Sequence, residues 1–108
     1  MEILELKEIF EEVWCRETSA CPDLWTKEDP ACGQCLSTAM IVQDILDGEV
    51  LLAIIGQKKE PHFWNLLPNG REEDLTSSQF PDGFILPQGR VISRELLGQY
   101  EIMCPEVR

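Results

Sequence analysis

The chain has 108 residues, 44% of them hydrophobic, which suits one domain over residues 1–108 with one modest core. Nine basic and twenty acidic residues give a formal net charge of −11, which repels phosphate backbones and anionic lipid headgroups, so we expect neither nucleic acid nor a membrane as a partner. The longest apolar run, 50–55, is far shorter than the roughly 20 residues that span a bilayer, and the glutamates among the first residues are unlike a signal peptide. These features predict a cytoplasmic protein.

The first 33 residues divide into a helix and a long loop. A stripe of apolar side chains recurs at helical spacing and predicts a helix over 3–16. The stripe consists of Ile3, Leu6, Phe10 and Val13, flanked by Ile9 and Trp14. Residues 17–33 are rich in Ser, Pro, Asp, Gly and Cys and predict an irregular loop anchored by a buried Trp25. Loops of this length are uncommon within a small domain and are often functional.

A second helix and a strand are expected in the middle of the chain. Apolar side chains occupy most positions of 34–47, which predicts a helix buried on most sides. Asp47-Gly48 ends this helix, because glycine readily takes the left-handed conformation found just past a helix C-terminus. The apolar run 50–55 that follows is too short for another helix and predicts a buried strand.

A hairpin follows, in which Pro68-Asn69-Gly70 joins two strands. A three-residue turn with its glycine in the left-handed bulge position pairs Leu67 with Arg71. Asp74 then lies diagonally opposite His62 on one face of the sheet. A two-residue Asn-Gly turn would move Asp74 to the other face. We favour the three-residue turn, because the fixed φ of its proline suits the first corner.

The sequence pattern also gives approximate bounds for the hairpin strands and for the elements that follow them. The hairpin strands are expected over 62–67 and 71–76, the segment 80–88 is broken by proline and glycine, and a short final helix is capped by Ser93 and covers 93–97.

Cys35 is the candidate nucleophile among five cysteines, which are an odd number in a chain without a secretion signal and are expected to be thiols. It stands at the start of the second predicted helix, where free N–H groups and the helix dipole favour a thiolate. Gly33 lets the chain turn sharply into this helix. The N–H of Cys35 and the side chain of Gln34 are candidate donors to an oxyanion. On its own, such a cysteine is more often a small buried hydrophobe in the first turn of a core helix.

His62, the only histidine of the chain, is the candidate base. In the favoured register Asp74 lies within its reach, and Glu72 is the substitute on the same face. A carboxylate fixes the tautomer of the ring and stabilises an imidazolium, which in turn stabilises a thiolate, as in a Cys-His-Asp triad. Taken separately, His62 is an exposed histidine at a strand end and Asp74 is a solvated carboxylate.

Three other uses of these residues remain open. Cys32-Gly-Gln-Cys35 has the two-residue gap of a zinc knuckle, but zinc would need further ligands from Cys15, Cys21 or His62, and we expect no metal or other cofactor. The same gap suits a thiol redox pair, although a long loop replaces the strand that precedes the helix in thioredoxin-like proteins. The third use is a non-catalytic binding or regulatory module, whose acidic surface meets a basic protein partner.

A set of motifs in fixed order spans most of residues 14–80. The motifs are Trp14…Glu17-Thr18-Ser19…Trp25…Pro30-Ala31…Gly33-Gln34-Cys35…Thr38-Ala39…Val42-Gln43-Asp44…Gly48-Glu49, then His62-Phe63-Trp64-Asn65…Leu67-Pro68-Asn69-Gly70…Asp74-Leu75-Thr76…Gln79-Phe80. Together they resemble the YunG-like family of small bacterial proteins, and this resemblance implies a fold but no activity. Cys32 departs from the pattern of that family, which weakens a shared role for the CxxC pair.

The order of helix-start cysteine, strand histidine and strand acid also resembles the core of papain-like and transglutaminase-like thiol enzymes. That resemblance implies Cys35 as nucleophile, His62 as general base and Asp74 as orienting acid, and it transfers no substrate. We therefore expect an α+β fold with a papain-like core, in which an N-terminal helix and a central helix headed by the cysteine pack on a small antiparallel sheet. The predicted function is a thiol hydrolase or acyltransferase, or a descendant of one, that acts on an amide, ester or thioester carbonyl of a small molecule or peptide.

Overall fold

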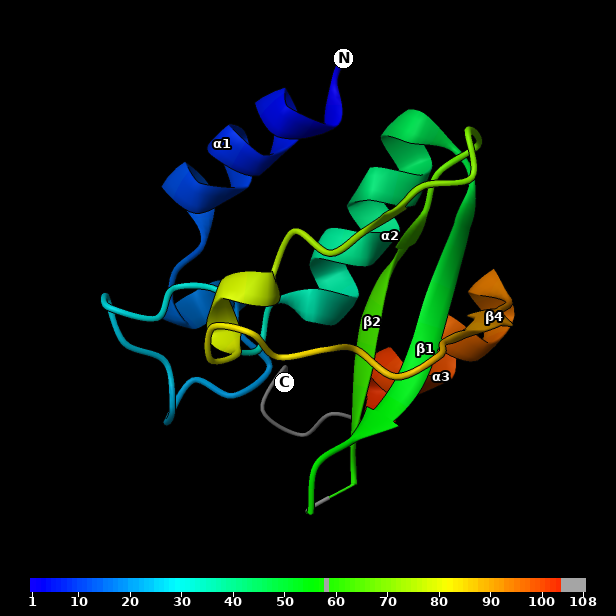
Figure 1. Cartoon of the computed structure of the whole chain (residues 1–108). Coiled ribbons are helices and arrows are strands. Elements are labelled where there is room, and N and C mark those ends of the chain that lie inside the picture. Colours follow the sequence, from blue (N-terminus) through cyan, green and yellow to red (C-terminus); the bar gives the residue numbers. More distant parts are fainter. Residues whose placement is uncertain (58, 104–108) are drawn as a thin grey trace.

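A computed structural model describes residues 1–57 and 59–103, which form three α-helices and a four-stranded antiparallel sheet (Figure 1). The elements are α1 (Ile3–Val13), α2 (Cys35–Leu46), β1 (Glu49–Ile55), β2 (Glu60–Leu66), β3 (Glu72–Glu73), β4 (Arg90–Ile92) and α3 (Arg94–Met103), with 3₁₀ turns at Arg16–Thr18 and Ser77–Gln79. The strand order is β3-β2-β1-β4. The predicted α+β class is confirmed. None of the described helices is long and apolar enough to cross a bilayer.

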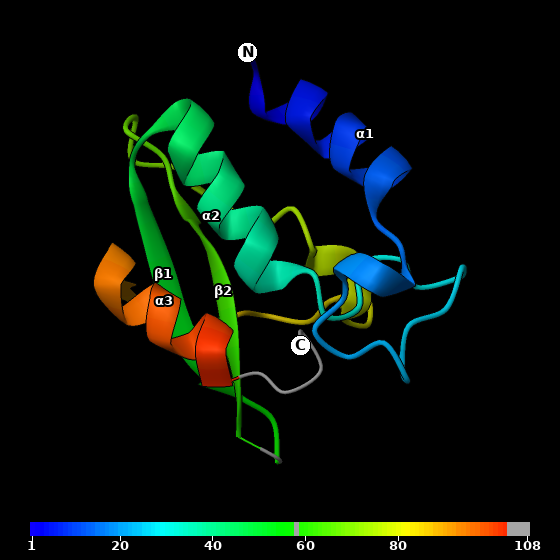
Figure 2. The same ribbon diagram turned by 180° about the vertical axis from the view of Figure 1, so that it is seen from behind.

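The sheet carries helices on one face and an extended segment on the other. α2 and α3 lie on the same face, as the view from behind shows (Figure 2), and their apolar side chains pack onto alternate residues of the strands. This core consists of Leu36, Ala39, Val50, Leu52, Phe63, Ile92 and Leu97. On the opposite face Leu51, Ala53 and Trp64 form a smaller cluster, over which the segment 80–89 passes (Figure 1) and against which Leu86 packs.

α1 lies beside α2, away from the sheet (Figures 1 and 2). Its buried stripe runs through Leu6, Phe10 and Trp14, which form a second core with the segment before α2 and with α2 itself. The indole Nε1 of Trp14 donates a buried hydrogen bond of 3.1 Å to Thr38 Oγ1 on α2. The N-terminal helix is thus confirmed, but it ends at Val13, whose side chain is exposed and not part of the stripe.

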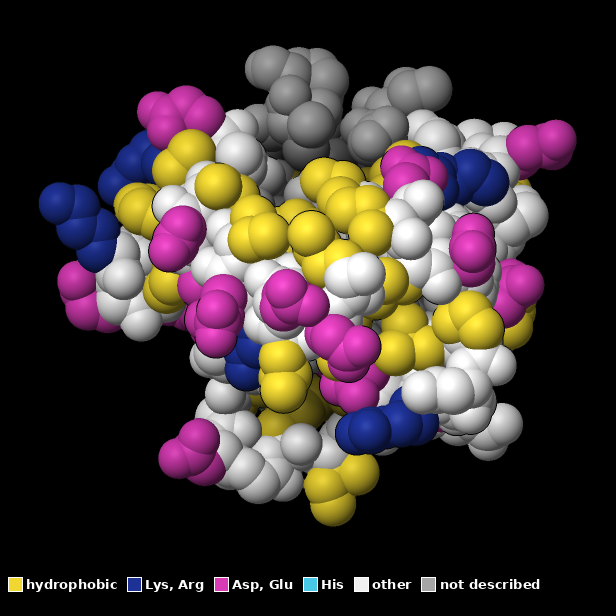
Figure 3. All heavy atoms as spheres, turned by 90° about the horizontal axis from the view of Figure 1, so that it is seen from above, with side chains coloured by type: hydrophobic (Ala, Val, Ile, Leu, Met, Phe, Trp, Pro, Cys, Tyr) yellow, Lys and Arg dark blue, Asp and Glu magenta, His cyan; other side chains and the backbone are white. Residues whose placement is uncertain are grey.

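α2 is less enclosed than its apolar composition predicts. Leu36, Ala39 and Val42 are buried, but the side chains of Ile41 and Ile45 are 42% and 48% exposed. The prediction of a helix buried on most sides is wrong, because α1 and the sheet leave one side of α2 uncovered in the described part of the chain. Apolar side chains accordingly gather on the surface in the view from above, among acidic ones (Figure 3).

The predicted three-residue turn of the hairpin is confirmed. β2 pairs with β3 through Asn65↔Glu73 and Leu66↔Glu72, and the next pair along is closed by the Leu67 N–H, which donates to the Arg71 carbonyl at 2.8 Å. Gly70 has φ +89°, and its N–H donates to the Leu67 carbonyl at 2.9 Å. The glycine therefore occupies the left-handed bulge position of this turn.

The second hairpin strand is shorter than the predicted 71–76. β3 ends at Glu73, because the backbone turns away from β2 into the 3₁₀ turn Ser77–Gln79. The Ser77 N–H donates to the Asp74 carbonyl at 3.2 Å and begins this change of direction. The sheet gains its fourth strand elsewhere, since β4 pairs antiparallel with β1 and was not predicted.

The last helix is longer than predicted. The Leu96 N–H donates to Ser93 Oγ at 3.3 Å, so the serine lies at the predicted start of the helix. α3 then runs to Met103 and not to Leu97. Leu97 itself is fully buried in the core beneath the sheet.

A buried amide joins α2 to β2. The Asn65 side chain is 2% exposed, and its Nδ2 donates to the backbone carbonyl of Ala39, in the middle of α2, at 3.0 Å. This bond fixes the helix along the strand that carries His62. The relative positions of Cys35 and His62 therefore depend on it.

Replacing this amide should lower stability. We expect Asn65→Ala to reduce the free energy of unfolding by about 1–3 kcal/mol, because it removes a buried hydrogen bond and leaves a gap. Urea unfolding followed by tryptophan fluorescence measures the change, and the exposed Gln99→Ala on α3 is the control. An Asn65→Ala protein as stable as the Gln99→Ala protein would contradict this role.

Candidate functional site

The structure brings together the three side chains that the sequence singled out. Cys35 is the first residue of α2, His62 lies in β2, and Asp74 follows β3 directly. His62 Nε2 is 2.7 Å from Asp74 Oδ2, and Cys35 lies close enough to the same ring to raise its pKa. Because Nε2 is taken by the carboxylate, Nδ1 is the ring nitrogen left for the thiol. The imidazole thus lies between the acid and the sulfur.

Asp74 is held by its own chain. Its Oδ1 accepts hydrogen bonds from the Thr76 N–H at 3.1 Å and from Thr76 Oγ1 at 3.0 Å. Gln79 Nε2 donates to the same hydroxyl at 3.0 Å, and Thr76 is 1% exposed. This is an Asx turn, which leaves Oδ2 for the histidine. Sequence reasoning missed Thr76 and Gln79, although the Asp-Leu-Thr spacing is a signal for such a turn.

His62 is buried, not an exposed strand-end histidine. It is 3% exposed and lies between two aromatic side chains. Trp64 stacks on it with ring centroids 5.6 Å apart, and Phe80 meets it edge-on at 4.8 Å. Trp64 Nε1 donates to Glu72 Oε1 at 2.9 Å. Glu72, the substitute acid of the sequence analysis, is therefore engaged by the indole.

The surroundings of His62 favour its charged form. Burial lowers the pKa of the ring, but the hydrogen bonds to Asp74 and to Cys35, together with the negative charges of both partners, outweigh that effect. The net result raises the pKa of His62 from 6.5 to about 9. The ring is therefore an imidazolium at neutral pH.

The start of α2 offers backbone donors beside Cys35. Gln34, the residue before it, makes no side-chain cap, and the N–H groups of residues 35–37 donate to no acceptor within the described part of the chain. Such groups and the helix dipole favour a negative charge. Gly33 has φ +74°, and a Cβ there would overlap Ser19 Oγ, so only glycine fits this entry to the helix.

The Gln34 side chain lies on the loop side of the helix start. It is fully buried, and its Nε2 donates to the Cys15 carbonyl at 3.0 Å. It is not among the residues that line the cavity at Cys35. The backbone N–H groups of α2, not this amide, are therefore the donors that adjoin the sulfur.

Cys35 and His62 line a cavity of about 630 Å³, a size common for small-molecule sites. Its walls come from the loop 20–33, the start of α2, the ends of β1 and β2 that meet there, and the segment 79–80. They are mainly apolar and include Leu24, Leu36, Ile55, Pro61, Phe63 and Phe80. The long loop thus forms part of the cavity wall. Its Trp25 is only half-buried, contrary to expectation, and donates from Nε1 to the Pro30 carbonyl at 3.0 Å.

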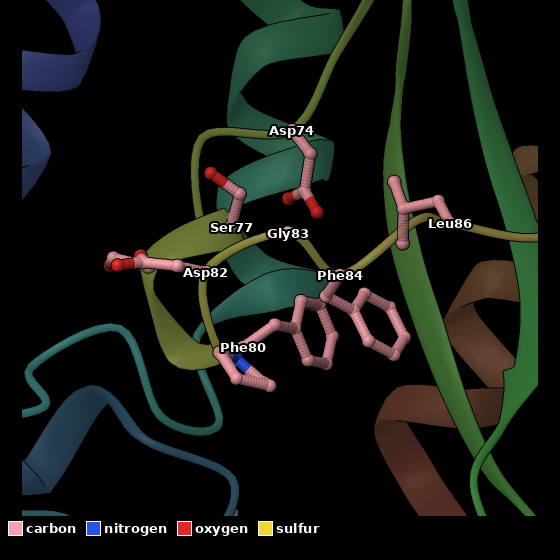
Figure 4. Close-up of a pocket in the computed structure, with 9 residues that line it drawn as sticks. Asp74, Ser77, Phe80, Asp82, Gly83, Phe84 and Leu86 are labelled. Carbon is pink, nitrogen blue, oxygen red and sulfur yellow. The ribbon is translucent and has the colours of Figure 1, made fainter.

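A second cavity, of about 500 Å³, lies on the other side of Asp74. Figure 4 shows Asp74 and Ser77 at one end of it and the rings of Phe80 and Phe84 side by side at the other. These rings stack with centroids 4.5 Å apart. Phe80 lines both cavities and therefore separates them beside His62.

The other cysteines do not form a metal site in the described part of the chain. Cys15, Cys21 and Cys32 are half-buried thiols, and no group of three or more His, Cys, Asp and Glu side chains among the described residues is placed to hold an ion. Cys104 lies outside the described residues. The zinc interpretation thus has no ligand set among the described side chains.

Comparison with known proteins gives a family. The family model described as YunG protein matches residues 2–103. The chain is 37% identical over 75 residues to the protein named "Uncharacterized protein YunG" of Bacillus subtilis (strain 168). That alignment covers 69% of this chain and 60% of the relative, less than two thirds of its length. No solved structure matches the chain.

The raised pKa of His62 makes stability depend on pH. Its contribution is fully present below the unfolded pKa near 6.5 and is lost as the pH rises through the folded pKa of about 9. We expect the free energy of unfolding to fall by about 3 kcal/mol across this interval from this group. Denaturant unfolding at a series of pH values measures it. His62→Gln should remove this part of the slope, and equal slopes in the two proteins would contradict the assignment.

Proposed function

The chain belongs to the YunG family, and we propose that in this member Cys35, His62 and Asp74 form a papain-like thiol site that acts on an amide, ester or thioester carbonyl. One observation carries the proposal: a single buried imidazole is hydrogen-bonded to a carboxylate and shares a cavity with a thiol at a helix start, which is close enough to raise the pKa of the ring. This is the arrangement by which a base activates a thiol nucleophile.

The sulfur has two sources of anionic stabilisation. The imidazolium of His62 provides a neighbouring positive charge, and the free N–H groups at the start of α2 add the positive end of a helix dipole. Asp74 holds the ring in the tautomer and orientation that presents Nδ1 to Cys35.

In the proposed reaction, the Cys35 thiolate attacks the substrate carbonyl carbon and forms a tetrahedral oxyanion. The N–H of Cys35 is the expected donor to that oxyanion, as at other acyl-transfer sites. The bond to the leaving group then breaks, and His62 gives its proton to the departing amine, alcohol or thiol. The remaining thioester is attacked by water or another acceptor that His62 deprotonates, and the cysteine is released.

The cavity supports an apolar acyl group as the substrate portion next to the carbonyl. Phe63, Leu36 and Leu24 line it together with the sulfur. Leu24 lies in the loop before α2 and is 67% exposed, so its burial by a ligand would release ordered surface water. We propose an ester, thioester or apolar peptide of small size as the substrate class.

The papain-like core remains part of the proposal. It rests on the order along the chain of a cysteine-headed helix, a strand histidine and an acid after the next strand, and on α2 packing on the sheet. Fold resemblance transfers no substrate, so the activity must be tested at the site.

Removal of the histidine should slow the reaction of Cys35 with alkylating agents. An ordinary thiol is less than about 1% ionised at pH 6, so a thiolate held by an imidazolium reacts much faster there. We expect His62→Gln to lower the rate of Cys35 alkylation by iodoacetamide at about pH 6 by roughly tenfold or more, and Asp74→Asn to lower it less. Mass spectrometry of the peptides measures the rate, with Cys15 in the same digest as internal reference.

Two outcomes decide this prediction. The triad is supported if only the Cys35 rate falls and circular dichroism shows that the variants remain folded. Cys35 that reacts no faster than Cys15 in the parent protein, and no slower after His62→Gln, would mean that the cysteine is a core residue. The chain would then be better described as a non-catalytic binding module.

The apolar wall should affect long acyl groups selectively. We expect the parent protein to hydrolyse 4-nitrophenyl acetate and 4-nitrophenyl hexanoate with release of 4-nitrophenol. Cys35→Ser should abolish both activities. Leu24→Ser should raise KM for the hexanoyl ester by roughly tenfold, because it removes apolar contact, and leave the acetyl ester unchanged. Equal effects on the two esters would contradict this binding role, and equal rates in the parent and Cys35→Ser proteins would contradict the enzyme.

A further inference from the structure

Two thiols line the same cavity on either side of a tight turn. Cys32 and Cys35 both contribute to its wall. The chain turns at Gly33, which lies between them and has φ +74°, and the Gln34 N–H donates to the Ala31 carbonyl at 3.1 Å within this turn. The negative charge of Cys35 is also close enough to raise the pKa of Cys32. A disulfide needs Cα atoms roughly 4.4–6.8 Å apart, which cysteines three positions apart can reach where the chain turns between them.

The two thiols differ in their surroundings. Cys35 faces the imidazolium of His62 and the free N–H groups of α2, which favour a thiolate. Burial raises the pKa of Cys32, as do the negative charges of Asp29, Glu60 and Cys35. These effects keep Cys32 in its thiol form. One sulfur is suited to attack an electrophile, and the other to act in a second step.

We propose that Cys35 is an oxidation site for a small hydroperoxide, and that Cys32 converts the oxidised product into a Cys32–Cys35 disulfide. The turn between the two cysteines and their shared cavity carry this inference. It requires the nucleophilic sulfur but no acyl transfer, so it stands apart from the proposed hydrolysis. It also gives a role to Cys32, which the triad does not use.

The first step oxidises Cys35. Its thiolate attacks one oxygen of the hydroperoxide, the O–O bond breaks, and the departing alkoxide or hydroxide takes a proton from His62. The product is a Cys35 sulfenic acid. The sulfur has lost two electrons, and the peroxide has been reduced to an alcohol or water.

The second step joins the two cysteines. The sulfur of Cys32 attacks the sulfur of Cys35, the S–O bond breaks, and the hydroxide leaves as water with the proton from the Cys32 thiol. The sum is two thiols and one hydroperoxide converted into one disulfide, one alcohol or water, and one further water. The disulfide blocks Cys35 until a dithiol reductant restores it by exchange.

Hydrogen peroxide tests the proposal on the whole chain. We expect the parent protein to lose two thiols and the mass of two hydrogen atoms, with peptide mapping locating the bond between Cys32 and Cys35. In Cys32→Ser the reaction should stop at the Cys35 sulfenic acid, which dimedone traps. Cys21→Ser is the matched control, because Cys21 lines the same cavity and its loss should leave the disulfide unchanged.

The contrary results are equally distinct. A bond from Cys35 to Cys21, a disulfide between two chains, or an unchanged disulfide yield in Cys35→Ser would overturn the proposal. Oxidation of Cys35 at the same rate as Cys15 would also overturn it. Ester release separates the two proposals. Peroxide should abolish it in the parent and in Cys32→Ser alike, because Cys35 is oxidised in both. A parent protein that forms the Cys32–Cys35 disulfide but releases no ester before peroxide is added would support the oxidation and contradict the hydrolysis.

Discussion

The register of one hairpin is the constraint on which the candidate site depends. Gly70 has φ +89°, and a Cβ there would meet nothing within 4 Å, so the glycine is needed for its backbone conformation and not for space. The turn that it closes sets Asn65 opposite Glu73, and the same register carries Asp74 to the side of His62. A slip of one residue would reverse the side-chain facing of the whole second strand. The contact between Asp74 and His62 therefore depends on the turn at Gly70, which neither residue belongs to.

The shortness of β3 is what lets other groups reach His62. β3 pairs only with Asn65 and Leu66, so in the described chain the part of β2 around His62 has no strand on that side. The 3₁₀ turn Ser77–Gln79 and Phe80 occupy this place, and the start of α2 approaches the same edge. A longer strand would have satisfied the backbone of β2 and excluded both the thiol and the aromatic cover. A longer β3 would have made further backbone hydrogen bonds with β2. The hydrogen bonds that the Asp74 side chain accepts from Thr76 offset their absence.

Much of this could be predicted from local patterns. The spacing of Leu6 and Phe10 gave α1, and the turn chemistry around Gly70 gave the register that brings Asp74 to His62. The Asp-Leu-Thr turn at Asp74 is a local feature that was missed, but the other misses discussed next depend on non-local contacts. β4 is three residues long and depends on pairing with β1, and the exposure of Ile41 depends on how many elements surround α2. The amide of Gln34 turns to a carbonyl nineteen residues away, which no short-range pattern predicts.

The burial of His62 also explains why its partners must act together. A charged ring that is 3% exposed is costly unless each nitrogen has a partner, since removing an ion from water carries a large penalty. Asp74 pairs with Nε2 and Cys35 with the other side of the ring, so the positive charge lies between two groups that can be negative. Trp64 and Phe80 limit water around this pair and so strengthen its electrostatics. Loss of either partner leaves a buried ring whose charge is less well balanced, and the protonation of the thiol and of the histidine is therefore one coupled equilibrium.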